Sequence, residues 1–555
     1  MRTDVPHGIE EGEARRGFDG EDGLRADSPG DSPGTGRGGD RRAFARGLML
    51  GTSGILVAVS GALVAVGCFL GLYVRPTSDD WCAAWKARDL GVFGITSDFY
   101  MTQNGRVANA FLSGVIYGDG LLGTEILPTV IAVTFTIGLV LLGSQFMRFL
   151  GARPRLLLLT AGALVLQALI YFAGTRSYQA LLWAPATISH TVPSVIGVWA
   201  LLLGIRTVRR TGGRARTLGF AATFLIACAL GTLSEPFTLV TGLLGAGAGL
   251  LAVPRFGLAR TWRPFTWCLV WCFGLLTGLI LLYTSPGARW RRAQQPARDS
   301  LLSSRELRAT AHDWLRMWES VTGQWAYLGA AAVGILIGLA VGLRASGSGR
   351  RALRASAADE GGLPREIPRP TLIALWALPV LVVVLGSFAV VVGLRSGYGP
   401  TGWTYARTWT NYLVPMELGL CAYGALFGRW AGRSLTSRRT SAETTSETAV
   451  TATAKTAYVP AAVAVVAAGA VVLASMAALI PSVQKLTTTT VSRAVAWDAQ
   501  NARIEKEARQ GATDVGYHPL YIGSLAEPFY TSNYTSDWAA ACVSKWYGVD
   551  RIHRR

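Results

Sequence analysis

Long apolar blocks without charged residues alternate along the chain with short polar segments in which arginine is frequent. The first block runs from Gly47 to Val74 and carries no charge, and about 20 apolar residues are enough for a helix to cross a bilayer. The blocks are apolar on all faces, which is typical of membrane-spanning helices. The pattern predicts an all-α polytopic membrane protein with about 11 transmembrane helices. We place them at residues 47–74, 126–147, 156–175, 186–205, 218–233, 236–254, 264–283, 325–343, 371–394, 411–428 and 458–481.

The arginine clusters predict the orientation of these helices. Arg41, Arg42 and Arg46 precede the first span, and later clusters fall in every second loop, as cytoplasmic loops do. The N-terminus is therefore expected in the cytoplasm, and an odd number of spans places the C-terminus outside. One expected outer loop, 284–324, is also rich in arginine. Cations on the outer face need another reason, such as binding a phosphate.

Three parts follow from this layout. Residues 1–45 are polar and form an expected disordered cytoplasmic leader. Residues 46–481 form the membrane domain, in which 75–125 is a large first outer loop. Residues 482–555 form a small outer tail with a short helix and an aromatic end, and we expect this tail to pack on the outer face.

Composition narrows the class further. The net charge of +19 would be compatible with nucleic-acid binding, but only 16% of the residues are charged and the mean hydropathy is +0.33. The arginines follow the loop rule, and there is no basic patch interleaved with aromatic residues, so nucleic acid is excluded as a partner. Cys82 and Cys542 both fall in expected outer segments, where disulfides persist. A bond between them would tie the first loop to the tail.

The strongest candidate chemistry is the sequence Ser78-Asp79-Asp80-Trp81, which comes directly after the first span. Carboxylates there lie close to the lipid surface, where a lipid-borne substrate presents its head group. One of the two can accept a proton from an attacking hydroxyl, while the other orients it or helps to bind a divalent cation. The alternative is a solvated helix end.

Further candidates share the expected outer face. Asn104 and Arg106 can contact a sugar or a phosphate, or else form an Asn-Gly turn followed by a cationic anchor. A lone histidine such as His190 is more often a hydrogen-bonded interfacial residue than a ligand. Glu235, between two closely joined apolar segments, either caps the turn or faces the same cavity as Asp79.

Arginines of two expected outer segments are phosphate candidates. Arg289 and Arg291 follow Ser285-Pro286-Gly287, and Arg407 stands among aromatic residues at the outer mouth of the tenth span. Arginine binds phosphate through two parallel hydrogen bonds. The alternative for these residues is attraction to anionic lipid head groups, which needs no specific site.

With these motifs the chain resembles the GT-C superfamily of integral-membrane glycosyltransferases. The SDDW, NGR, SEP and SPG motifs and the closing KWYGVDRI, spread over 47–555, are similar more narrowly to a poorly characterised bacterial family of unknown-function and glucosyltransferase-like proteins. One departure is Ala288, where that family leads us to expect an amide-bearing residue after SPG.

The resemblance implies transfer of a sugar from a polyprenyl-phosphate carrier to an acceptor on the outer face of the cytoplasmic membrane, usually with inversion. It implies that Asp79 is the general base with Asp80 as its helper, and that Arg289, Arg291 and Arg407 hold the donor phosphate. His190 and Glu235 would line the cavity. Members differ in whether they need a divalent cation, so a metal at Asp79 and Asp80 stays open.

Two other classes of function compete with this one. A transporter or flippase for a lipid-linked sugar would share the spans and the arginines, but we see no repeated half in the sequence. An envelope assembly protein would have no need of the acidic pair. The expected partners are the lipid-linked donor, an envelope glycan, lipid or protein as acceptor, and membrane lipids.

Overall fold

The computed structural model describes residues 36–294, 303–343, 368–443, 450–522 and 534–555. The leader expected to be disordered, 1–45, lies mostly outside these residues. Residues Gly47–Arg555 form one compact unit, and the description that follows is of this unit.

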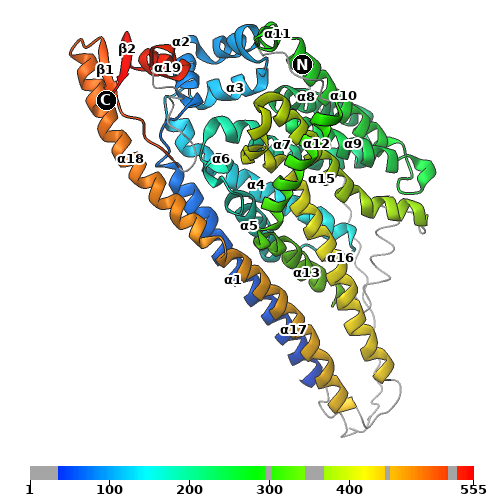
Figure 1. Ribbon diagram of the computed structural model, residues 1–555. Helices are drawn as coiled ribbons and strands as arrows, with labels where there is room; N and C mark the ends of the chain where they lie inside the picture. Colours follow the sequence, from blue (N-terminus) through cyan, green and yellow to red (C-terminus); the bar gives the residue numbers. More distant parts are fainter. Residues whose placement is uncertain (1–35, 295–302, 344–367, 444–449, 523–533) are drawn as a thin grey trace, which may run out of the picture. The chain divides into compact units, whose positions relative to one another are not determined.

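The described chain is almost entirely helical (Figure 1). The α-helices are α1 (Gly36–Gly71), α2 (Asp79–Asp98), α3 (Val107–Ile116), α4 (Leu122–Phe149), α5 (Leu156–Phe172), α6 (Ser177–Leu181), α7 (Ala184–Arg209), α8 (Gly213–Leu233), α9 (Glu235–Leu251), α10 (Arg263–Thr284), α11 (Pro286–Ala293), α12 (Ser304–Thr322), α13 (Leu328–Gly342), α15 (Arg369–Tyr398), α16 (Thr410–Glu443), α17 (Val450–Ala477), α18 (Ile480–Arg509) and α19 (Trp538–Tyr547). The short helical turns are η1 (Phe99–Gln103), η2 (Pro254–Phe256), η3 (Trp325–Tyr327), η4 (Gly399–Thr404), η5 (Ala406–Trp409) and η6 (Tyr534–Ser536). The strands are β1 (Asp514–Tyr517) and β2 (Arg551–Arg554).

Eight helices of the described chain are long and apolar enough to cross a membrane, which supports an all-α, multi-pass membrane protein. They are Gly47–Gly71, Leu122–Phe149, Ala184–Arg209, Gly213–Leu233, Arg263–Thr284, Trp325–Gly342, Arg369–Thr404 and Val459–Arg509. The expected count of 11 is not confirmed. The spans expected at 156–175 and 236–254 correspond to α5 and α9, which have 17 residues each. Since a helix rises 1.5 Å per residue, 17 residues reach only about 25 Å against a hydrocarbon core of about 30 Å. The span expected at 411–428 lies within α16, which is not among the eight.

Glycine faces let two helix pairs approach closely. A Cβ added to Gly338 of α13 would lie 2.0 Å from the carbonyl oxygen of Ala425, and one on Gly428 of α16 would lie 2.3 Å from that of Ile335. Between α8 and α10, a Cβ on Gly278 would lie 2.1 Å from the Cys228 carbonyl oxygen. Such small-residue contacts are a common way for helices to associate in lipid, where apolar side chains gain little by moving from lipid to a helix interface.

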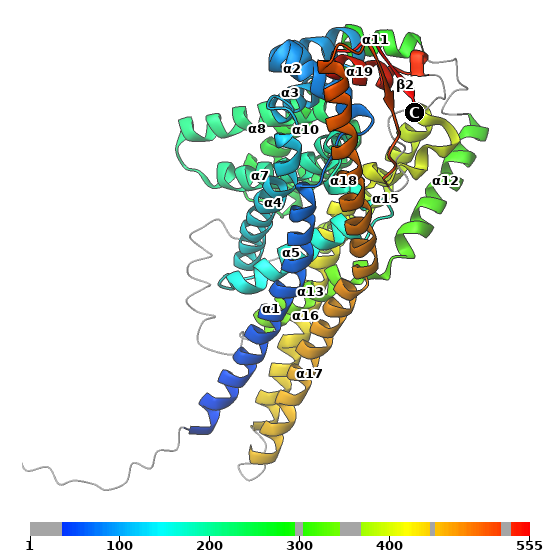
Figure 2. The ribbon, with the colours of Figure 1, turned by 90° about the vertical axis from the view of Figure 1, so that its left-hand side faces the viewer.

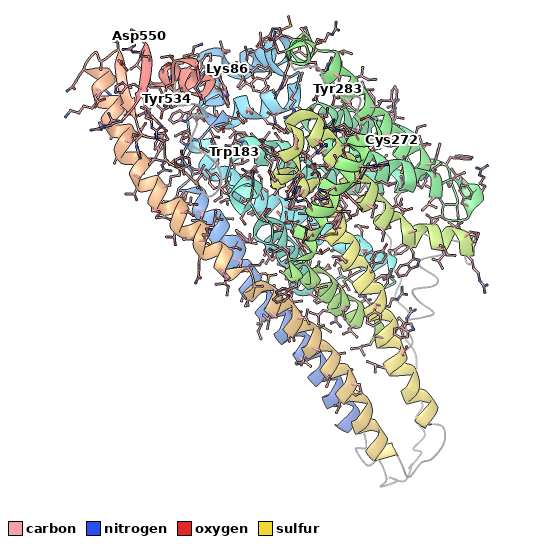
Figure 3. All side chains as sticks on the ribbon, in the orientation of Figure 1. Lys86, Trp183, Cys272, Tyr283, Tyr534 and Asp550 are labelled. Carbon is pink, nitrogen blue, oxygen red and sulfur yellow. A yellow bond between two sulfur atoms is a disulfide. The ribbon has the colours of Figure 1, made fainter. Side chains whose placement is uncertain are left out.

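The expected first outer loop, 75–125, is itself helical and forms most of what we call the cap: α2, η1, α3, α11, α19, β1 and β2. Figures 1 and 2 show α2, α3, α11, α19 and β2 together at one end of the helical body, and Figure 3 places the side chain of Lys86 there. The cap therefore combines segments from the first, middle and last parts of the chain.

The C-terminal tail packs on the first loop. Its helix α18 starts at Ile480 and is longer than the short helix that we predicted. Trp81 is fully buried against Trp497, Tyr517 and Tyr547, with ring centroids 6.0, 6.3 and 5.8 Å away. Strands β1 and β2 pair in parallel, with Asp514 opposite Arg551.

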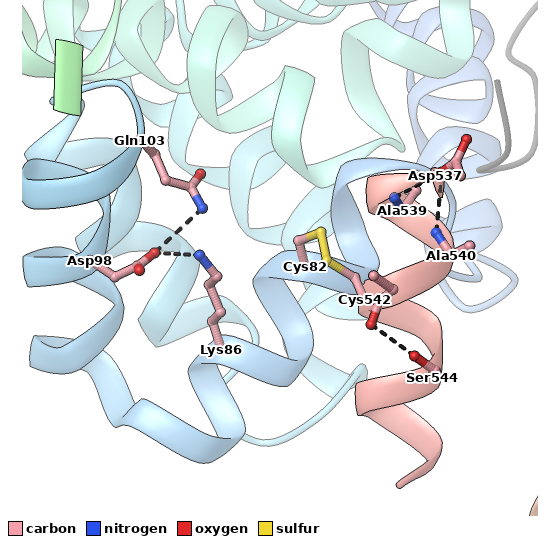
Figure 4. Close-up of a disulfide and its surroundings, with 10 residues drawn as sticks. Cys82, Lys86, Asp98, Gln103, Asp537, Ala539, Ala540, Cys542 and Ser544 are labelled. Carbon is pink, nitrogen blue, oxygen red and sulfur yellow. Dashed lines mark hydrogen bonds and ion pairs between the residues drawn. A yellow bond between two sulfur atoms is a disulfide. The ribbon is translucent and has the colours of Figure 1, made fainter. Parts of the chain in front are cut away.

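A disulfide between Cys82 and Cys542 joins α2 to α19 (Figure 4), with the two Cα atoms 4.9 Å apart. This confirms the pairing predicted from the sequence. Beside it, the side chains of Lys86 and Asp98 form an ion pair that links the parts of α2 before and after the kink at Gly91. The first loop is thus fixed to the tail both covalently and by an aromatic cluster.

Candidate functional site

The acidic motif begins with a strained turn. The backbone N–H of Asp80 donates to the carbonyl oxygen of Thr77, 3.1 Å away, and Ser78 between them has φ 52° and ψ −117°. These angles belong to the first central position of a type II′ turn, where glycine is usual. Ser78 is the one non-glycine residue with positive φ in the described part of the chain. Such strain costs about 1–3 kcal/mol and persists only where the surroundings hold it.

The tail supplies the support. Arg493 of α18 donates from Nη1 to the Arg75 carbonyl oxygen at 3.1 Å and from Nη2 to that of Pro76 at 2.7 Å. The Arg75 side chain in turn contacts Asp498 of α18 at 2.6 Å and Glu125 of α4 at 3.2 Å. The residues just before the turn are therefore held by α18 and α4.

Asp79 and Asp80 occupy different environments. Asp80 is buried, and its carboxylate accepts hydrogen bonds from the Thr77 backbone N–H at 2.8 Å and from the Tyr117 hydroxyl. Burial raises the pKa of Asp80 to about 7, although both hydrogen bonds oppose this, and the charge of Asp79 adds to the increase. The side chain of Asp80 therefore serves the turn and the contact with α3.

Asp79 is exposed to solvent, and the described residues offer its carboxylate no hydrogen bond or ion pair. Desolvation nevertheless raises its pKa, and the charges of Arg407, Arg291 and Arg106 oppose this. Protein atoms therefore surround the Asp79 side chain, and part of it stays in contact with solvent. Three other acids of the first loop are paired instead: Asp89 with Arg88 at 2.6 Å, Asp98 with Lys86, and Glu125 with Arg75.

The three arginines around Asp79 come from separate segments. Arg106 directly precedes α3, Arg291 lies on α11 and Arg407 lies in η5. All three were predicted from the sequence as phosphate or substrate ligands, and the structure brings them into electrostatic range of Asp79. We call Asp79, Arg106, Arg291 and Arg407 the acid–arginine cluster.

The NGR motif is a turn that positions Arg106. The Asn104 side-chain oxygen accepts a hydrogen bond from the Arg106 backbone N–H at 3.0 Å, so the turn reading of Asn104 is confirmed. Gly105 has φ 74°, and a Cβ there would lie 2.1 Å from Oγ of Ser285. A Cβ on Gly287 would lie 2.5 Å from the backbone nitrogen of Gln103. The NGR and SPG motifs therefore interlock through their glycines.

Glu235 forms an ion pair with Arg106, with Oε2 2.8 Å from Nη2. It is the first residue of α9, whose N-cap is Ser234. The pair neutralises Arg106 and fixes its direction. The Glu235 carboxylate thus contacts Arg106 of the cluster, and its place in a cavity shared with Asp79 stays a prediction.

The arginines of α11 make different contacts. Ser285 caps α11 by accepting a hydrogen bond from the Ala288 backbone N–H at 3.1 Å. Arg289 donates to the Thr284 carbonyl oxygen and Arg292 to that of Tyr283, each at 2.8 Å. Arg291 is the one that acts electrostatically on Asp79. The role of Arg289 as a phosphate ligand remains a prediction, because its side chain is bound to the backbone carbonyl of Thr284.

His190 is buried in α7 and lies in electrostatic range of Arg407 and Arg106. Its Nδ1 is 3.2 Å from Nδ2 of Asn411, which also donates to the Thr408 carbonyl oxygen at 2.7 Å. Because a carbonyl oxygen only accepts, this contact assigns the amide nitrogen, so His190 Nδ1 accepts and the ring proton is on Nε2. His190 is hydrogen-bonded, as its interfacial reading predicted.

Three residues of this region escaped the sequence analysis: Tyr117, Arg493 and Arg176. Tyr117 and Arg493 contact the acidic turn across 37 and more than 400 residues, so no local signal points to them. Arg176 lies between α5 and α6, over the ring of Tyr405 at 5.8 Å. Its position in an expected outer loop was the same signal that drew attention to Arg289 and Arg291.

A divalent cation at the acidic pair stays a prediction. Both oxygens of Asp80 already accept hydrogen bonds, and Asp79 faces arginines. Within the described ranges, no three or more His, Cys, Asp or Glu side chains stand close enough together to hold a metal ion.

Comparisons with protein-family models, with curated proteins and with solved structures found no match for this chain.

Proposed function

We propose that the protein transfers a sugar from a polyprenyl-phosphate carrier to an acceptor hydroxyl of the cell envelope. The observation that carries the proposal is Asp79: an accessible carboxylate among Arg106, Arg291 and Arg407, next to a strained turn. Strained backbone and perturbed carboxyl groups gather at functional sites. A base beside cations is what transfer from a phosphate leaving group requires.

In this reaction Asp79 accepts the proton of the acceptor hydroxyl while the hydroxyl oxygen attacks the anomeric carbon of the donor sugar. The bond between that carbon and the phosphate oxygen breaks, and its electron pair leaves with the phosphate. Arg291 and Arg407 stabilise the negative charge that develops there. A single displacement of this kind inverts the anomeric configuration. Glu235 and Asn104 position Arg106, and His190 lines the same region.

The orientation proposed for the chain places the cap outside the cytoplasmic membrane, with the N-terminus inside and the C-terminus outside. The disulfide between Cys82 and Cys542 supports this because disulfides persist in oxidising compartments. The arginine clusters of the alternate loops support it independently. The proposed layout of 11 spans in a GT-C-like arrangement adds α5, α9 and α16 to the eight long apolar helices.

One observation favours the alternative of a transporter or flippase for a lipid-linked sugar. Glu417 of α16 is completely buried, and neither of its carboxylate oxygens has a hydrogen-bond partner among the described residues. Ionisable groups at such positions are rare in membrane helices and often belong to a transport path. Glu417 lies outside the acid–arginine cluster.

The two functions are separated by assaying the purified protein in liposomes with a panel of polyprenyl-phosphate sugars. Glycosyl transfer to glycan, lipid and protein acceptors is measured beside movement of the labelled donor across the bilayer, in wild type and in Glu417→Gln. The proposal expects transfer from at least one donor, retained in Glu417→Gln. Donor movement that is lost in Glu417→Gln, without transfer to any acceptor, would contradict it and favour the flippase.

A further inference from the structure

Two arginines share one aromatic ring beside the acid–arginine cluster. The Arg407 guanidinium lies 5.0 Å from the ring centre of Tyr405 and 5.1 Å from that of Trp183, and Arg176 lies 5.8 Å from that of Tyr405. Trp183, labelled in Figure 3, is buried just before α7. Aromatic faces hold guanidinium groups in place without neutralising their charge.

The charges of Arg176 and Arg407 have no carboxylate bound to them. Neither side chain forms an ion pair or a hydrogen bond within the described ranges, and the repulsion between the two groups, after desolvation, lowers the pKa of Arg176. Two other partly buried arginines of the described chain have a carboxylate partner instead: Arg106 pairs with Glu235 at 2.8 Å, and Arg395 with Asp313 at 2.5 Å. Like charges held together without a counter-ion indicate a site for an anion.

The balance of charge suggests what that anion is. The two guanidinium groups at Tyr405, those of Arg176 and Arg407, together carry two positive charges with no carboxylate bound to them, whereas Arg106 is neutralised by Glu235. A phosphate monoester has a second pKa of about 6 and therefore carries nearly two negative charges at neutral pH. A phosphodiester carries only one. A dianion thus matches the site better than a monoanion.

We propose that Arg176 and Arg407, held on Tyr405, form a phosphate site that selects a phosphomonoester over a phosphodiester. What this selectivity does in the reaction rests on the proposed function. There the donor is a phosphodiester and the released carrier is a monoester, so the site matches the charge of the leaving group better than that of the substrate. Binding that grows as the leaving group gains charge favours the transition state over the ground state. Arg176 then acts on the departing phosphate, together with Arg407.

The test is direct binding to the full-length protein in lipid nanodiscs, with no acceptor and no sugar present. The probes are inorganic phosphate, a short-chain prenyl monophosphate and the methyl phosphodiester of the same prenyl phosphate. The variants are Arg176→Gln, Arg176→Lys and, as a control for the loss of one charge, Arg308→Gln on the exposed face of α12. Thermal unfolding of each variant verifies that it is folded.

The wild type is expected to bind the monophosphate at least tenfold more tightly than the diester, which one added charge-assisted contact suffices to produce. Arg176→Gln should abolish this preference with little change in diester binding, Arg176→Lys should keep part of it, and Arg308→Gln should leave it unchanged. Binding of inorganic phosphate with the same dependence on Arg176 would show that the phosphate group alone is recognised, and binding of the prenyl monophosphate alone would show that the lipid is needed too.

Equal affinities for monoester and diester in the wild type, or a preference that survives Arg176→Gln in a folded protein, would overturn the inference. Because the assay involves no transfer, a protein that proves to be a flippase could still show the preference. Failure of the proposed function and failure of this inference are therefore distinguishable.

Discussion

At the scale of single residues, the neighbours Asp79 and Asp80 divide the tasks of an acidic pair by burial. Asp80 accepts hydrogen bonds from Tyr117 and Thr77 inside the cap, while the carboxylate of Asp79 stays accessible beside arginines. The two neighbours differ in burial because α2 begins here, directly after a turn in which Ser78 has a positive φ. The proposed general base and its buried neighbour are thus placed by one turn of backbone.

The environment of Asp80 gives a pH dependence with a defined sign. Its pKa is raised from 3.8 to about 7, so the folded state binds the proton more tightly than the unfolded state. The stabilisation from this group is full below pH 3.8 and is lost as the pH rises to about 7, with an upper limit of roughly 4 kcal/mol at 1.36 kcal/mol for each pH unit. We expect the melting temperature of Asp80→Asn, relative to wild type, to rise between pH 5 and pH 8. A difference that does not change with pH would contradict this assignment.

At the scale of elements, the segments that carry the site are held together by close contacts at glycines. Gly105 and Gly287 let the NGR turn and the start of α11 lie against each other, which brings Arg106 and Arg291 to Asp79. In the helical body, Gly338 and Gly428 do the same for α13 and α16. Backbone-to-backbone contacts of this kind give little room for adjustment, so the positions of the arginines depend on them.

The glycine contact between α13 and α16 is tested by Gly338→Ala. The new methyl group would lie 2.0 Å from the Ala425 carbonyl oxygen, and the helices must separate to admit it. We expect a loss of about 1–3 kcal/mol, the usual cost of overpacking, seen as a lower melting temperature in detergent. The matched control is Gly393→Ala on α15, where no atom lies within 4 Å of the added Cβ. Equal melting temperatures of the two variants would show that α13 and α16 do not pack as described.

At the scale of the whole chain, the tail completes the site that the first loop begins. Arg493 holds the backbone before Ser78, Trp81 is buried among aromatic residues of the tail, and Cys82 is bonded to Cys542. The tail is therefore part of the site's scaffold, and its loss should disturb Asp79 even though no residue of the tail belongs to the acid–arginine cluster.

The double variant Cys82→Ser/Cys542→Ser tests this attachment. Removing a native disulfide typically costs 2–4 kcal/mol, and we expect a corresponding fall in melting temperature under non-reducing conditions. The control is Cys228→Ser, since Cys228 is a free cysteine of α8. Alkylation of the wild type before reduction should leave Cys82 and Cys542 unmodified. Two reactive thiols at these positions would contradict the disulfide.

The sequence predicted the helical membrane architecture because its apolar blocks are long and free of charge. It also indicated Asp79, Arg106, Arg291 and Arg407 as candidate site residues. Motifs on one expected face of a membrane are confined to a thin layer, so we expect them to lie near one another. The residues alone did not separate Asp80 from Asp79, and only the resemblance gave them different roles, since burial of Asp80 depends on Tyr117 and on packing of the tail. Nor could the sequence find Arg493 or the cation pair at Tyr405, which arise from contacts between distant segments. The count of 11 spans is not confirmed, since α5 and α9 have only 17 residues each.

The most direct test of the central claim compares sugar transfer by wild type, Asp79→Asn and Asp89→Asn in liposomes, with donor binding measured in parallel. Asp89 is the matched control because it lies on the same helix, exposed and paired with Arg88. The account predicts that Asp79→Asn binds the donor but loses transfer by about 10²–10⁴-fold, the usual contribution of a general base, while Asp89→Asn behaves as wild type. Transfer by Asp79→Asn at the wild-type rate would contradict the account.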